Sequence, residues 1–332
     1  MKIEFPGFVD LQVNGFAGVD FNDPACTTHQ IRHAIDQLLS TGVTQFLPTL
    51  ITSQRNHFAR CAQTLLQVSH PSIIGLHMEG PYISPDDGPR GAHAREDTTA
   101  ASIDDFKRRQ EAADGRIVLV TLAPEVDGAL NLVEYLAASG VRVAIGHTAA
   151  TAGQIRDAIS AGATLSTHLG NGCAQTLPRH PNMIWEQLAG DELLASLIVD
   201  GHHLPAATVK TMVRAKTPAR VILVTDAMAA AKCAPGVYTI GGARVELDVH
   251  GRVAAPGATN LAGSALAMND AVANTVRFTD LTLAEVLPMA TTLPARYLGV
   301  EPAGQVTGFW NETDFVLQID SVSPTITKAV DQ

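Results

Sequence analysis

Eight short apolar runs rich in β-branched residues recur along this chain of 332 residues, separated by stretches with helical spacing of apolar residues. The runs cover residues 7–14, 43–50, 72–79, 116–123, 141–148, 164–171, 194–201 and 220–227. Intervening stretches at 29–42, 131–140 and 151–162 end in glycine, the residue that most often closes a helix. Eight alternations of strand and helix predict an α/β fold of the (β/α)8 barrel type, in which helices surround parallel strands.

An open, doubly wound sheet is the alternative to a barrel. That fold would place a glycine-rich phosphate loop directly after its first strand. Residues 13–23 read VNGFAGVDFND, which lacks the G-x-G-x-x-G spacing. The sequence therefore favours the barrel.

The pattern changes after the eighth run. Residues 237–257 alternate between apolar and polar with glycine turns, which predicts a hairpin or meander, and residues 304–320 again look like strands. We predict a barrel from residues 7–235 and 259–300. A small, reduced β-sandwich domain would comprise both chain ends and the insert after strand eight, at residues 1–6, 236–258 and 301–332.

Charge and hydropathy argue against several classes of partner. The net charge is −10, and no basic run interleaved with aromatic residues occurs, so we expect no nucleic-acid partner. No segment reaches the roughly 18 apolar residues of a membrane span, and the N-terminus lacks a signal-peptide pattern. We therefore expect a cytoplasmic enzyme with a small-molecule substrate. The four cysteines form no C-x-x-C pair, which indicates reduced packing cysteines.

Four residues of metal-ligand or acid type end four of the apolar runs: Glu79, His147, His168 and Asp226. A lone histidine at a strand end is more often structural, but three ligand types on three strand ends favour a metal site. One carboxylate and two imidazoles suit a catalytic divalent metal with an open coordination position. Asp226, whose alternative role is a helix N-cap, suits a proton carrier.

The first run contributes amides where metal-dependent barrel hydrolases often carry His-x-His. Gln12 and Asn14 stand at the end of this run, and amides are poor ligands beside histidine and carboxylate. No lysine occurs on the fourth run to form a bridging carbamate. We therefore expect a single metal ion.

These motifs together resemble the N-acetylglucosamine-6-phosphate deacetylase family of the amidohydrolase superfamily. The matching stretches include PGFVDLQVNGFAGVDFND, GLHMEGPYIS, AIGHTAAT, THLGNG, DGHHL and VTDAMAAA, in the family's order over nearly the whole chain. The resemblance implies that Glu79, His147 and His168 hold one zinc ion, with iron as the alternative. It also implies that Asp226 is the catalytic acid and base and that His93 helps to polarise the acetyl carbonyl.

The resemblance further implies contacts to a sugar phosphate. Arg179, His203 and the backbone amides of Asn171 and Gly172 match the substrate-binding positions of the family. A barrel with a small β-sandwich, and a homodimer, are expected on the same basis.

The chain departs from the family pattern in two places, and the second leaves the substrate open. The family usually has a further segment before PGFVD that supplies strands to the sandwich, so we expect a reduced small domain. Residues 170–173 read GNGC, where the family usually has an aromatic residue, Asn, Ala and Met. The alternatives to N-acetylglucosamine-6-phosphate are N-acetylgalactosamine-6-phosphate, a non-phosphorylated N-acyl compound, or a non-catalytic sugar-binding role.

Overall fold

The central sheet of the computed structural model, which describes residues 1–258 and 260–323, consists of eight parallel strands. They are β2 (Phe8–Val13), β5 (Val43–Ile51), β6 (Leu76–Glu79), β7 (Ile117–Leu122), β8 (Arg142–Ile145), β9 (Leu165–Ser166), β10 (Leu194–Leu197) and β11 (Val221–Leu223). They neighbour one another in chain order, and a parallel bridge between Val13 and Ala227 joins the first to the last. The predicted eight-stranded barrel is confirmed.

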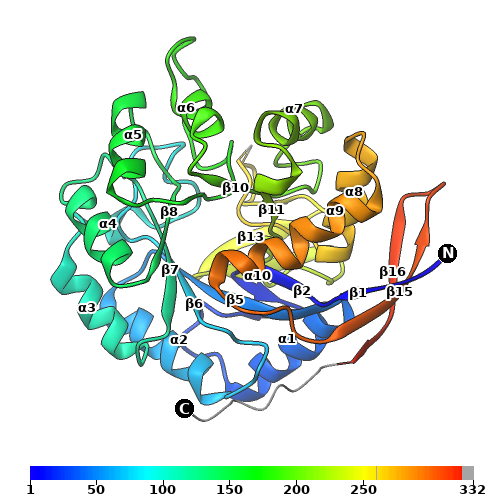
Figure 1. Cartoon of the computed structure of the whole chain (residues 1–332). Helices are drawn as coiled ribbons and strands as arrows, with labels where there is room; N and C mark the ends of the chain where they lie inside the picture. Colours follow the sequence, from blue (N-terminus) through cyan, green and yellow to red (C-terminus); the bar gives the residue numbers. More distant parts are fainter. Residues whose placement is uncertain (259, 324–332) are drawn as a thin grey trace.

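Helices lie on the outside of these strands (Figure 1). They are α1 (Thr28–Ser40), α2 (Arg55–Gln67), α3 (Ile103–Ala112), α4 (Ala129–Ala138), α5 (Ala152–Ala161), α6 (Met183–Ala189), α7 (Ala206–Lys216), α8 (Met268–Phe278), α9 (Leu283–Ala290) and α10 (Thr292–Leu298). None of the helices in the described part of the chain is both long and apolar enough to cross a membrane.

Local sequence explains where the helix α5 begins and ends. Thr151 and Gln154 form a capping box, in which each side chain accepts a hydrogen bond from the other residue's backbone N–H. The helix ends at Gly162, whose φ of 117° lies in the left-handed region that favours glycine. The predicted glycine stop is confirmed at this position.

Both chain ends contribute to one antiparallel sheet, as predicted. It pairs β1 (Lys2–Pro6) with β15 (Gln305–Asn311), which pairs in turn with β16 (Val316–Ser323). Alternate residues of β15 are buried, and Val306, Trp310 and Leu317 pack into the main hydrophobic core. Figure 1 shows this sheet projecting beside the barrel near the N-terminus.

The insert after strand eight forms a sheet of its own and does not extend the chain-end sheet. Its strands are β12 (Gly236–Ile240), β13 (Ala243–Leu247) and β14 (Val253–Ala254). Their apolar side chains, including Ile240 and Val245, pack with Met228 in a separate hydrophobic cluster. The insert is therefore held at the end of β11, where the barrel opens, because its apolar face is buried there. The domain boundaries given above stay a prediction, and their residues 259 and 324–332 lie outside the described part.

A short hairpin of β3 (Gly15–Phe16) and β4 (Val19–Asp20) follows the first barrel strand. All four cysteines are free, as predicted.

Candidate active site and metal centre

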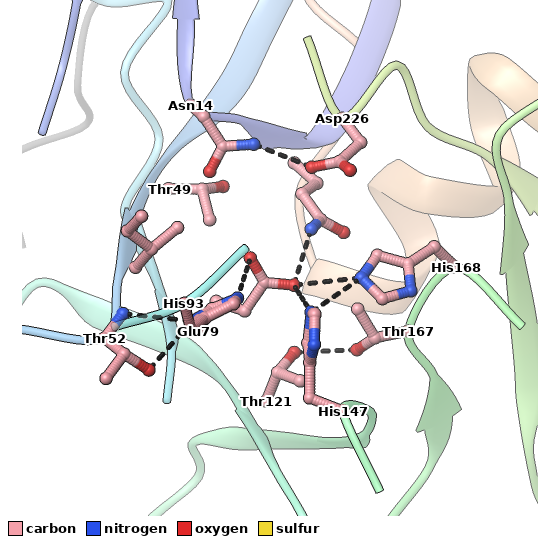
Figure 2. Close-up of polar contacts among 12 residues, drawn as sticks. Asn14, Thr49, Thr52, Glu79, His93, Thr121, His147, Thr167, His168 and Asp226 are labelled. Atoms are coloured by element: carbon pink, nitrogen blue, oxygen red, sulfur yellow. Dashed lines mark hydrogen bonds and ion pairs between the residues drawn. The ribbon is translucent and has the colours of Figure 1, made fainter. Parts of the chain in front are cut away.

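Glu79, His147 and His168 converge at the carboxyl ends of three barrel strands. The Oε1 atom of Glu79 lies 3.2 Å from Nε2 of His147 and 3.1 Å from Nε2 of His168. The two imidazole nitrogens are 3.2 Å apart, and all three side chains are buried. Figure 2 shows the three groups pointing toward one another.

The spacing of these three atoms fits a divalent metal ion. Zinc binds nitrogen and carboxylate oxygen at about 2.0–2.1 Å, and a tetrahedron of that size has edges of about 3.3–3.4 Å. The three observed separations, 3.1 to 3.2 Å, are close to such an edge. One carboxylate and two imidazoles are also the ligand types of a catalytic site with an open position. The chain therefore has a Glu/His/His cluster able to hold a metal.

The loop of residues 88–93 orients His147. The Nδ1 atom of His147 donates a hydrogen bond of 2.9 Å to the carbonyl of Pro89, which turns the Nε2 atom toward Glu79, where it could bind a metal ion. The ring lies close to two glycines, since a Cβ added at Gly172 would be only 3.0 Å from His147 Nδ1. A Cβ added at Gly91 would be 3.2 Å from the same ring. Larger residues at either position would displace the His147 ring.

Three site residues have a left-handed backbone, which is uncommon outside glycine. The φ angles are 50° at His147, 30° at His168 and 49° at Asp226. Such conformations cost about 1–3 kcal/mol each and are found mainly at functional sites, where the surrounding structure holds them. Each residue follows a barrel strand, so the left-handed turn is what directs its side chain across the mouth.

Hydrogen bonds and charge keep Glu79 ionised. Burial alone would raise the pKa of Glu79, but the hydrogen bonds and charges of His147 and His168 outweigh it and hold the pKa well below its usual value. Gln12 also donates to Glu79 Oε1 at 2.8 Å. The Nδ1 atom of His168 is buried without a hydrogen-bond partner among the described residues. An ionised, buried carboxylate with two imidazoles is suited to a cation.

Asp226 lies across the mouth from this cluster and is also buried. Asn14 donates a hydrogen bond of 2.7 Å to its Oδ1 atom. Burial, and then repulsion from Glu79, raises the pKa of Asp226 to about 6. A carboxyl group that titrates near neutral pH can both accept and return a proton.

His93 reaches the same cluster from the loop after β6. Its Nε2 atom lies 3.8 Å from Glu79 Oε2, and its ring centre lies 4.3 Å from that of His147. Burial, and then the charge of His147, lowers the pKa of His93 to about 3, so its imidazole is neutral. Thr52 contacts Nδ1 of His93 on the side away from Glu79 (Figure 2).

These side chains line one cavity of about 480 Å³ at the barrel mouth. The predicted residues Glu79, His93, His147, His168, Asn171, Gly172, His203 and Asp226 all border it. The remaining wall is largely apolar and includes Leu177, Ile184 and, from the insert, Ile240. No lysine or arginine is among the described residues that line this cavity.

The predicted substrate-binding groups differ in whether the protein already uses their hydrogen-bonding atoms. The backbone N–H of Asn171 donates to the carbonyl of His168 at 2.9 Å, so the turn itself uses this amide. The backbone N–H of Gly172 has no partner within the described part of the chain. His203 is fixed by Asp200, whose Oδ2 atom lies 2.6 Å from His203 Nδ1. The other ring nitrogen of His203 is thus available to the cavity.

Arg179 is exposed, and it is absent from the lining of the cavity. It lies between Leu177 and Ile184, which do line the cavity. The contact of Arg179 with a phosphate therefore remains a prediction.

Sequence reasoning missed four residues that hold the site. Gln12 and Asn14 were weighed only as poor metal ligands, whereas they donate to the two site carboxylates. Strand alternation was the available signal, because Asn14 directly follows β2 and residues two apart along a strand point to the same face. Thr52 carried no signal, because only the folded chain places it against His93. For Asp200 the signal was its position three residues before His203.

Comparisons with known proteins agree with this geometry. The chain is 36% identical to an N-acetylgalactosamine-6-phosphate deacetylase of Escherichia coli O157:H7, over 89% of this chain and 78% of the relative. It is 32% identical to an N-acetylglucosamine-6-phosphate deacetylase of Bacillus subtilis (strain 168), over 92% and 78%. The crystal structure of N-acetyl-D-glucosamine-6-phosphate deacetylase from Mycobacterium smegmatis superposes with a TM-score of 0.89 at 30% identity, covering 97% of this chain and 86% of that one. The amidohydrolase family model matches residues 3–307, and the chain therefore belongs to the amidohydrolase family.

Proposed function

We propose that this amidohydrolase removes the acetyl group from an N-acetyl amino-sugar phosphate, converting N-acetylglucosamine-6-phosphate to glucosamine-6-phosphate and acetate. One observation carries the proposal: a carboxylate, two imidazoles, an aspartate and a further neutral histidine border a single cavity. Relatives at 32% and 36% identity bear the names of deacetylases for two such phosphates.

Glu79, His147 and His168 would hold one divalent ion, zinc in preference to iron. When bound, such an ion lowers the pKa of a water molecule and draws electron density from a carbonyl group. The donor set and its spacing support this assignment.

Asp226 carries the proton in this proposal. It accepts a proton from the attacking water as the water oxygen bonds to the acetyl carbon. When the carbon–nitrogen bond breaks, Asp226 returns the proton to the departing nitrogen, which leaves as the amine, and the acetic acid formed releases its remaining proton to become acetate. A pKa near 6 supports both halves of this cycle at neutral pH.

His93 and the loop residues would bind the substrate. The neutral imidazole of His93 donates a hydrogen bond to the acetyl carbonyl, where negative charge develops. Three residues that border the cavity are suited to bind sugar hydroxyls: His203, Gly172 through its backbone N–H, and Asn171. Arg179 would approach the phosphate from outside the cavity.

A second candidate keeps the reaction and changes the substrate. The relative at 36% identity is named for N-acetylgalactosamine-6-phosphate, and the described cavity wall holds no lysine or arginine for a phosphate. An epimeric sugar phosphate or a non-phosphorylated N-acyl compound fits these observations. A non-catalytic sugar-binding role has no use for Asp226 beside the metal ligands, so we give it less weight.

Acetate release tests the proposal. The purified protein, with its metal content measured on the same sample, is assayed with N-acetylglucosamine-6-phosphate, its galacto epimer and the unphosphorylated sugar. We expect fast release from N-acetylglucosamine-6-phosphate and about one metal ion per chain. Release from the galacto epimer or the unphosphorylated sugar alone would support the second candidate. No acetate from any of them, with metal bound, would contradict both phosphate assignments.

We further propose that the protein acts as a homodimer in the cytoplasm. The homodimer derives from the family resemblance, and the location derives from the charge and hydropathy of the sequence. Sedimentation of the purified protein would test the first, since a mass of one chain contradicts it.

A further inference from the structure

Thr52 holds one side of the His93 ring. It directly follows β5, and both it and His93 are buried. Its hydroxyl Oγ1 lies 2.8 Å from Nδ1 of His93, and its backbone N–H donates to the same nitrogen at 3.4 Å. Because a backbone N–H can only donate, Nδ1 of His93 acts as the acceptor. The proton of the neutral ring therefore lies on Nε2.

The Nε2–H group of His93 points into the cavity. Nε2 lies 3.8 Å from Glu79 Oε2, and His93 borders the cavity beside the metal-ligand cluster. The ring of His147 contacts the His93 ring at 4.3 Å between centres, which limits rotation on that side. Figure 2 shows Thr52 and Glu79 on opposite sides of the His93 ring.

Gly80 supplies an independent observation for the same contact. A Cβ at position 80 would lie only 2.1 Å from Oγ1 of Thr52, so the hydroxyl occupies space that glycine leaves empty. The φ of Gly80 is +82°, in the region that disfavours other residues. The Thr52 hydroxyl has no other hydrogen-bond partner within the described residues, so its hydrogen bond is made with His93 alone.

We propose that Thr52 is a positioning residue that sets the tautomer of His93, so that Nε2–H rather than a lone pair faces the acetyl carbonyl. The other tautomer would place a lone pair against the carbonyl oxygen, where charge develops, and would repel it. This inference rests on the proposed function, which assigns the carbonyl contact to His93.

A pair of variants separates this role from packing. Thr52→Val keeps the shape but removes the hydroxyl contact of 2.8 Å, which leaves only the longer backbone bond of 3.4 Å to Nδ1 of His93, whereas Thr52→Ser keeps both. Loss of an outer partner of this kind typically costs about 10–100-fold in activity. We expect kcat of T52V to fall by about that factor with KM within about twofold, and T52S to restore most of kcat. An unchanged kcat in T52V, or an equal loss in T52S, overturns the proposal.

Nitrogen-15 NMR of the wild-type protein at pH 7 tests the tautomer without substrate. The His93 signals are assigned by their absence from His93→Gln. We expect a protonated Nε2 and an unprotonated Nδ1, and a protonated Nδ1 overturns the proposal even if T52V fails to fold. Wild-type protein that shows this tautomer but releases no acetate would count against the proposed function and not against the Thr52–His93 contact.

Discussion

The side-chain amide nitrogen of Asn14, Nδ2, lies 2.7 Å from Oδ1 of Asp226, although the two residues are 212 positions apart in the sequence. The backbone N–H of Asn14 also donates to the carbonyl of Ala227 at 2.7 Å. Both contacts lie on the seam where β2 meets the chain after β11, so closure of the barrel itself positions Asp226. With Oδ1 engaged by Asn14, Oδ2 is the oxygen available to carry a proton.

Asn14→Leu should impair catalysis more than binding. The leucine keeps the volume and removes the donor, so Asp226 loses its orientation. We expect kcat to fall by about 10–100-fold with little change in KM. Asn274→Leu is the matched control, because the side-chain amide of Asn274 donates a similar hydrogen bond, to the carbonyl of Val199, outside the cavity. Equal kcat values for the two variants would count against an orienting role for Asn14.

The pH profile of kcat/KM should show an acid limb with a midpoint at or below about 6. Burial, and then the charge of Glu79, raises the pKa of Asp226 to about 6. The deprotonated form accepts the proton, so activity is present above this pKa and is lost as the pH falls through it. A bound cation offsets the charge of Glu79 and moves the midpoint down. In Asn14→Leu the limb should move up, because the Asn14 hydrogen bond lowers the pKa of Asp226.

Asp226→Asn should abolish turnover and leave the metal bound. The amide cannot accept the water proton, and general acid–base catalysis contributes about 10²–10⁴-fold. The measurements are acetate release and metal content per chain on the same preparation. Turnover retained near the wild-type rate would falsify the acid/base role of Asp226.

Removing the metal should lower the melting temperature. A ligand at a thousand times its Kd stabilises the folded state by about 4 kcal/mol, so a chelator should lower Tm by several degrees and added zinc should restore it. Glu79→Gln provides the comparison, because losing the carboxylate weakens the site. If the chelator shifts the Tm of Glu79→Gln as far as that of wild type, the metal does not bind at Glu79.

Arg179→Ala should weaken binding of a phosphorylated substrate specifically. A hydrogen bond to a charged group contributes about 1.5–3 kcal/mol, and the exposure of Arg179 places the effect near the lower value, roughly tenfold in kcat/KM. The unphosphorylated sugar should show no change. Arg108→Ala, an exposed arginine of α3 that does not line the cavity, serves as the control. An unchanged kcat/KM for the phosphate favours the non-phosphorylated substrates.

Much of the barrel could be predicted because its pattern is local. Each parallel strand is buried on both faces and therefore appears in the sequence as a continuous apolar run. The positions of Glu79, His147, His168 and Asp226 at strand ends followed from the same runs. The insert at residues 236–258 was harder to place, since an alternating pattern predicts strands but not the surface that buries their apolar side.

The sequence by itself determined the alternation of strands and helices, the metal-ligand types and their common edge, because these depend on periodicity and on the direction of parallel strands. Only the tertiary structure decided which groups hold the site residues. Gln12 against Glu79, Asn14 against Asp226, Thr52 against His93 and Asp200 against His203 are contacts of particular atoms. Such contacts depend on strand register, barrel closure and turn geometry, and three of these four pairs join residues at least 41 positions apart. For these three pairs the order of residues along the chain gives no information about the contact, so the folded barrel alone brings their atoms together.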